Sequence, residues 1–135
     1  MAIKTYTGSC HCGAIRFEAD LDLSAGTSKC DCTFCLKTRN WSVITKPDCL
    51  RVRAGEEELT DYPRTDGPVR SPFCKRCGVR AFSRGHLEEL GGDYVSIRVA
   101  CLDDASPEEL LAGPVQYCDG RNDNWWNPPA EVRHL

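Results

Sequence analysis

Seven of the ten cysteines in this 135-residue chain fall into three short clusters whose spacing is typical of metal ligands. Two sulfurs separated by one or two residues can reach the same ion, and thiolates are common zinc ligands. The clusters are Cys10-His11-Cys12-Gly13, Cys30-Asp31-Cys32-Thr33-Phe34-Cys35 and Cys74-Lys75-Arg76-Cys77-Gly78. Four thiolates close one tetrahedral site and three remain, so the sequence predicts two zinc ions.

The first and third clusters predict a structural zinc site made of Cys10, Cys12, Cys74 and Cys77. In each cluster the glycine after the second cysteine permits a tight turn. Because the site would join two distant parts of the chain, much of its binding energy would be folding energy. The alternative is two unrelated pairs of buried or redox-active thiols.

The middle cluster, Cys30, Cys32 and Cys35, offers three thiolates from one loop. Three protein ligands plus an open position are the arrangement of a catalytic zinc, and a thiolate-rich zinc suits a soft incoming ligand such as a thiolate. The alternative is a second closed structural site, whose fourth ligand comes from elsewhere. The candidates for that ligand are Cys49, His86, Cys101 and Cys118.

Short strands are expected to position these clusters, because apolar and polar residues alternate in several stretches. The expected strands cover residues 14–18, 41–45, 50–53, 79–83 and 95–99. One short helix is predicted after Ser106, which is a good N-cap, with Pro107 in the first turn and Glu109 completing a capping box. Leu110 and Leu111 would form its buried face, and Gly113 and Pro114 would end it.

Composition limits the possible functions. The length fits one domain over residues 1–135, and no apolar run approaches the roughly 20 residues of a membrane span. The net charge of −3 makes the chain a poor general partner for nucleic acid. The first residues do not form an export signal, so ten cysteines predict reduced thiols or metal ligands in a cytoplasmic protein.

The motifs resemble those of a known family. Residues 8–17, Gly-Ser-Cys-His-Cys-Gly-Ala-Ile-Arg-Phe, look like the opening of the glutathione-dependent formaldehyde-activating enzyme (GFA) family, which includes the domain of centromere protein V. The middle cluster, residues 73–78 and Leu102-Asp103-Asp104 fit as well. The resemblance covers about residues 4–126. The chain differs at Asp31, where the family commonly has histidine, and at residues 115–118, where the family often has a histidine.

The resemblance implies a mainly β structure, the β-tent zinc fold of packed antiparallel sheets, here with one short helix. It implies structural zinc at the four paired cysteines and a second, more labile zinc at the middle cluster. It also implies carbon–sulfur lyase activity of the S-(hydroxymethyl)glutathione synthase type, which joins glutathione to formaldehyde or releases it.

Three hypotheses about function follow. In the first, a thiol such as glutathione is held at Cys30, Cys32 and Cys35 and adds to a small aldehyde. The second is a non-catalytic zinc-stabilised module that binds a protein, and the third is a thiolate-zinc redox sensor. For the enzyme, glutathione's two carboxylates call for cations near the metal, and a tryptophan could wall the pocket. The candidates are Lys37, Arg39, Arg121 and Trp125, with Arg64 and Arg70 as further cations.

Overall fold

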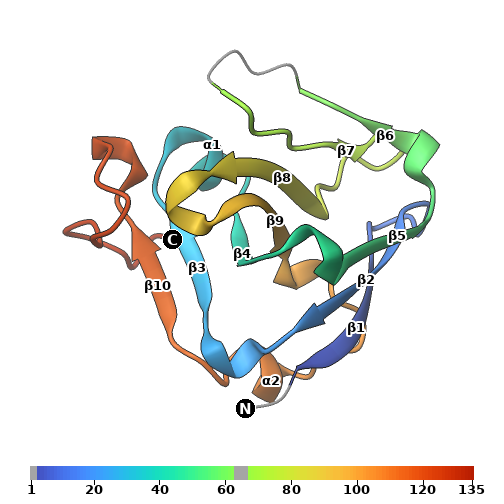
Figure 1. The fold of residues 1–135 in the computed structure, drawn as a ribbon, viewed down its shortest axis with the longest axis horizontal. Coiled ribbons are helices and arrows are strands. Elements are labelled where there is room, and N and C mark those ends of the chain that lie inside the picture. The colour runs from blue at the N-terminus through green and yellow to red at the C-terminus, as the bar shows by residue number, and fades with distance from the viewer. Residues whose placement is uncertain (1–2, 63–66) are drawn as a thin grey trace.

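The computed structural model describes residues 3–62 and 67–135, and this part of the chain is mainly β (Figure 1). Arg64 therefore lies outside the described residues. The strands form a five-stranded, a three-stranded and a two-stranded sheet, accompanied by two short α-helices and several 3-10 turns. No helix in the described part is long and apolar enough to cross a membrane.

The five-stranded sheet has the strand order β10-β3-β4-β9-β8. Its strands are β3 (Thr27–Cys30), β4 (Trp41–Thr45), β8 (Phe82–Leu87), β9 (Gly92–Arg98) and β10 (Val115–Cys118). Neighbouring strands are antiparallel except for β10 and β3, which run parallel with Cys118 opposite Cys30. The parallel pair brings the C-terminal part of the chain beside the segment that carries the middle cysteine cluster, as Figure 1 shows.

The three-stranded sheet is antiparallel, with the order β1-β2-β5. Its strands are β1 (Lys4–Ser9), β2 (Arg16–Leu21) and β5 (Leu50–Ala54). The two-stranded sheet pairs β6 (Leu59–Thr60) with β7 (Phe73–Cys74). The chain turns between β1 and β2 at the first cysteine cluster, and Cys74 of the third cluster ends β7.

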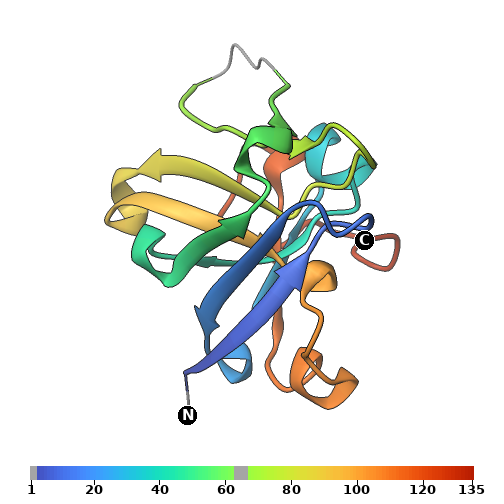
Figure 2. The ribbon, with the colours of Figure 1, turned by 90° about the vertical axis from the view of Figure 1, so that its right-hand side faces the viewer.

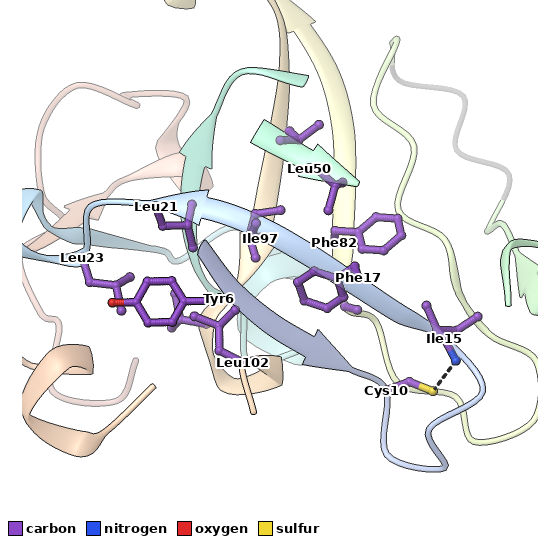
Figure 3. Close-up of a cluster of buried hydrophobic side chains, with 14 of the residues drawn as sticks. Tyr6, Cys10, Ile15, Phe17, Leu21, Leu23, Leu50, Phe82, Ile97 and Leu102 are labelled. Carbon is purple, nitrogen blue, oxygen red and sulfur yellow. Dashed lines mark hydrogen bonds between the residues drawn. The ribbon is translucent and has the colours of Figure 1, made fainter. Parts of the chain in front are cut away.

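The hydrophobic core lies between the three-stranded and five-stranded sheets (Figures 2 and 3). Phe17 of β2 is only 1% exposed and meets Phe82 of β8 edge to face, with ring centroids 5.7 Å apart. Val95 and Ile97 of β9 are fully buried on the same side. The alternation seen in the sequence therefore turns one face of each strand into this core.

Most expected strands are present, but two begin later than predicted: the strand expected over residues 14–18 begins at Arg16, and the one over residues 79–83 shifts further. Residues 41–45 form β4 as predicted, whereas the strand expected over residues 79–83 begins only at Phe82. The reason is the turn of the third cysteine cluster. Cys74 donates its backbone N–H to the carbonyl of Val79, and Gly78 donates to Cys74, so the backbone at Val79 is used by the turn.

The predicted helix is confirmed as α2 (Pro107–Leu110), and both hydrogen bonds of its capping box are present. Leu111 was wrongly placed in its buried face, because the helix ends after one turn and the Leu111 side chain is 73% exposed. A second helix, α1 (Thr33–Lys37), was not expected. It begins where the sulfur of Cys32 accepts a hydrogen bond from the N–H of Cys35 and acts as N-cap.

We predict that Phe17→Ala lowers the free energy of unfolding by about 3–5 kcal/mol, since it removes a fully buried ring and leaves a cavity. Leu111→Ala is the control, with an expected change within about 0.5 kcal/mol because that side chain is exposed. Chemical denaturation of both variants with bound metal measures the difference. Equal losses for the two variants would contradict this assignment of the core.

We also predict a pH-dependent contribution from Glu109. The Tyr6 hydroxyl, the Ser106 N–H and Lys4 donate to its carboxylate, in that order of effect, and lower its pKa to about 2. A lowered pKa stabilises the fold above the unfolded-state pKa of about 4.3, and that stabilisation is lost as the pH falls towards 2. Glu109→Gln should therefore destabilise the chain at pH 6, and its difference from the unchanged chain should shrink steadily as the pH falls from about 4.3 towards 2. A pH-independent difference between the two unfolding curves would contradict this role.

Candidate metal centre

The four sulfurs of Cys10, Cys12, Cys74 and Cys77 come together as the sequence predicted, with every pair within 4.8 Å. The sulfur of Cys12 lies 3.7 Å from that of Cys10 and 3.7 Å from that of Cys74. These separations exclude disulfides, whose S–S length is about 2.05 Å. They match the edge of about 3.8 Å expected of a tetrahedron with zinc–sulfur bonds of about 2.3 Å. This cluster can hold a metal ion.

The backbone shapes this four-cysteine cluster through two similar turns. Gly13 and Gly78, which follow the second cysteine of each pair, both have a φ of +81°, a conformation that favours glycine. In the first turn the N–H of Ile15 donates to the sulfur of Cys10 at 3.3 Å. Cys10 and Cys74 are buried against the core, whereas Cys12 is exposed. The cluster therefore lies at the edge of the core, with one side towards the solvent.

The sulfurs of Cys30, Cys32 and Cys35 form a second group, also within 4.8 Å of one another, which we call the cysteine trio. Cys30 ends β3, Cys32 is the N-cap of α1, and Cys35 lies inside α1. Each sulfur accepts a hydrogen bond: Cys30 from the N–H of Cys32, Cys32 from the N–H of Cys35, and Cys35 from the Asn40 side-chain amide, at 3.3, 3.3 and 3.4 Å. Such donors favour the thiolate form, which is the form that binds metal.

The ionisation of the trio is uneven. The neighbouring thiols of Cys30 and Cys35 hold the pKa of Cys32 far below its ordinary range, helped by the N–H groups of Cys35 and Phe34. The same contacts, together with burial, raise the pKa of Cys30. Three sulfurs so close together cannot all ionise without a cation, which fits them to bind a soft metal ion.

No fourth histidine, cysteine or carboxylate of the described residues joins the trio. Of the candidates, His86 binds Asp93 and Glu88 on the β8–β9 hairpin, and the thiol of Cys101 donates to the carbonyl of Arg80. Cys49 lies in the 3-10 turn before β5, and Cys118 faces Cys30 across the β10–β3 pair without entering the group. The trio is thus one ligand short of closure within the part of the chain described.

The turn after β10 covers one side of the trio. The buried carboxylate of Asp31 accepts a hydrogen bond from the N–H of Arg121 at 2.9 Å, which fixes the turn over Gly120–Asn122. A Cβ atom at Gly120 would lie 2.6 Å from the sulfur of Cys30 and 2.6 Å from the ring of Trp125. Asp31 therefore helps to hold the turn, with Gly120, beside the sulfur of Cys30.

The predicted substrate-binding residues have different surroundings. Trp125, 43% exposed, lies beside the trio, whereas Lys37 and Arg121 are exposed to solvent. Arg39 donates to the backbone carbonyl of His134 at 2.7 Å, so the last residues described pass close to α1. The further candidate Arg70 pairs instead with Asp61.

Two arginines that the sequence did not single out line a cleft of about 340 Å³ next to α1, namely Arg80 and Arg98. Arg39, Trp41 and Ala100 line this cleft and also a smaller hollow of about 140 Å³, into which Cys35 opens. The alternation of apolar and polar residues over 95–99 identified Arg98 only as a polar position on a strand. Its place beside the trio depends on long-range packing that no local pattern reveals.

Comparison with known proteins agrees with the motifs. The model of the family described as glutathione-dependent formaldehyde-activating enzyme matches residues 5–119. The chain is also similar to a Rhodobacter sphaeroides protein of known crystal structure, with 30% sequence identity and a TM-score of 0.66. That match covers 82% of this chain and 99% of the other.

We predict that Gly120→Ala displaces Cys30 and reduces the metal bound per chain by about one ion, because the new methyl group would overlap the Cys30 sulfur. Gly85→Ala is the matched control. Its methyl would press on the Tyr94 ring instead, away from both cysteine clusters, and should leave the metal content unchanged. Elemental analysis of both purified variants measures the effect, and an unchanged metal content in Gly120→Ala would contradict it.

Proposed function

This chain belongs to the glutathione-dependent formaldehyde-activating enzyme family, and from that membership we propose that it is a carbon–sulfur lyase that joins a thiol to a small aldehyde. The proposed thiol is glutathione or a similar compound, and the proposed aldehyde is formaldehyde or another small aldehyde. We assign zinc to both cysteine clusters, with a structural ion held by Cys10, Cys12, Cys74 and Cys77.

The observation that carries the proposal is the difference between the two clusters. The four-cysteine cluster has a complete ligand set, whereas the trio has three sulfurs and, within the described residues, no fourth ligand. A zinc ion bound by Cys30, Cys32 and Cys35 would lower the pKa of an incoming thiol and favour the nucleophilic thiolate. Three protein ligands and one exchangeable position are characteristic of catalytic zinc sites.

The reaction itself is a balanced addition without oxidation or reduction. The thiol sulfur forms a bond to the carbonyl carbon, the π electrons of the carbonyl move to its oxygen, and that oxygen takes up the proton released by the thiol. The reverse reaction breaks the same carbon–sulfur bond. The chain's own part is to hold the trio in place, through the backbone donors of α1, the Asn40 amide and the Asp31-fixed turn.

We predict that Cys32→Ser removes one metal ion per chain and abolishes acceleration of the reaction between glutathione and formaldehyde, while the fold is retained. Cys32 is one of the three sulfurs of the trio and caps α1, but it is not among the residues of the core between the sheets. Cys49→Ser is the control, since Cys49 lies outside both clusters, and it should keep full metal content and activity.

Adduct formation is followed by loss of free thiol in the metal-loaded chain, with circular dichroism as the measure of folding. A loss of fold in Cys32→Ser would favour a second structural metal instead. An unchanged chain that binds two metals yet gives no acceleration over buffer would exclude formaldehyde as its aldehyde.

A further inference from the structure

Arg98, at the end of β9, is a half-buried cation with weak hydrogen-bond partners. Its guanidinium donates to the carbonyl and the hydroxyl of Thr38, at 3.4 and 3.3 Å, which is long for a charged donor. Among the described residues, no carboxylate lies within 4 Å of it, whereas Arg51, Arg53 and Arg76 each pair with one. Burial lowers the pKa of Arg98, but an arginine stays charged. This half-buried charge therefore has no carboxylate partner among the described residues.

Arg80 brings a second positive charge to the same cleft. Its guanidinium lies over the rings of Phe34 and Phe73, at 5.1 and 4.8 Å from their centroids, and donates to the carbonyl of Ser71. It is close enough to Arg98 to lower the pKa of Arg98 further by repulsion. Two guanidinium groups that converge on one cleft of about 340 Å³ form a site that favours an anion.

The cleft adjoins the cysteine trio. Arg39, Trp41 and Ala100 line both the cleft and the hollow that contains Cys35. A peptide of three residues spans up to about 10 Å when extended. A tripeptide-sized thiol with its sulfur at the trio would extend beyond the trio, and this cleft is a neighbouring hollow that could receive one of its carboxylates.

We propose that Arg98, together with Arg80 of the same cleft, forms an anion subsite that binds a carboxylate of the thiol substrate. This inference rests on the proposed function and narrows it: the substrate is a thiol that carries a carboxylate several bonds away from its sulfur. Bidentate binding of a carboxylate suits the planar guanidinium fork, so lysine is a poor substitute at this position.

S-Methylglutathione tests the subsite without the reaction, because it keeps both carboxylates and has no free thiol. Calorimetry on the metal-loaded full chain should show that it binds at least about tenfold more tightly than its dimethyl ester, the effect expected from one charge-assisted contact. Arg98→Gln should lose about tenfold in affinity for S-methylglutathione, and Arg98→Lys should recover only part of it. Lys46→Gln makes the same change of charge at an exposed lysine that lines neither hollow, and should bind as the unchanged chain does.

Equal affinity for S-methylglutathione and its ester in the unchanged chain would overturn the proposal, and this comparison does not depend on how the variants fold. Absence of binding, or equally tight binding of inorganic phosphate, would overturn it too, the latter by showing a general anion site.

The proposed function and the proposed anion subsite can be refuted independently. A chain that binds the probe through Arg98 but does not accelerate the addition refutes only the proposed function. A chain that adds formaldehyde equally well to glutathione and to its diester refutes only the subsite.

Discussion

The structure depends first on the meeting of Cys12 and Cys74, whose sulfurs lie 3.7 Å apart although 62 residues separate them in the chain. Four thiolates within 4.8 Å of one another would repel strongly. A metal ion at their centre would neutralise this repulsion and link the two segments that carry the cysteines. A metal ion bound there would fix the turn between β1 and β2 against the end of β7. It would thereby join the three-stranded sheet to the segment that leads into β8 and the core.

From this cluster, a short line of contacts leads to the cysteine trio. Phe73 precedes one ligand, Cys74, and Arg80 follows another, Cys77, by three residues. The guanidinium of Arg80 lies over Phe73 and also over Phe34, which stands between Cys32 and Cys35 in α1. Cation–π contacts of this kind contribute on the order of 0.5–2 kcal/mol each. The turn of the four-cysteine cluster therefore also helps to set the position of α1, and the two clusters are not independent in space.

The sequence revealed those parts of the molecule that short-range chemistry determines. The grouping of the cysteines, the capping box of Ser106 and Glu109, and the strand over Trp41–Thr45 all follow from residues a few positions apart. The features that it missed depend on distant partners. The helix α1 begins at a sulfur cap rather than at a usual N-cap residue, the parallel pairing of β10 with β3 joins segments nearly ninety residues apart, and Arg98 reaches the trio only through the packing of β9 beside β4. Asp31 belongs to the same class, because its partner is the backbone of Arg121.

The two clusters differ in how much of the chain must be ordered to form them. The four-cysteine cluster is therefore linked to the stability of the fold, whereas the trio is not. Closing the four-cysteine cluster orders a long loop, whose entropy cost rises with its length, so the site is coupled to the folding of the whole chain. The trio needs only six consecutive residues, and its donors come from its own loop, α1 and Asn40. A change of ligand at the trio can therefore take place without loosening the core between Phe17 and Phe82. This separation suits the proposed exchange of a fourth ligand at the trio, because that exchange would leave the four-cysteine cluster untouched.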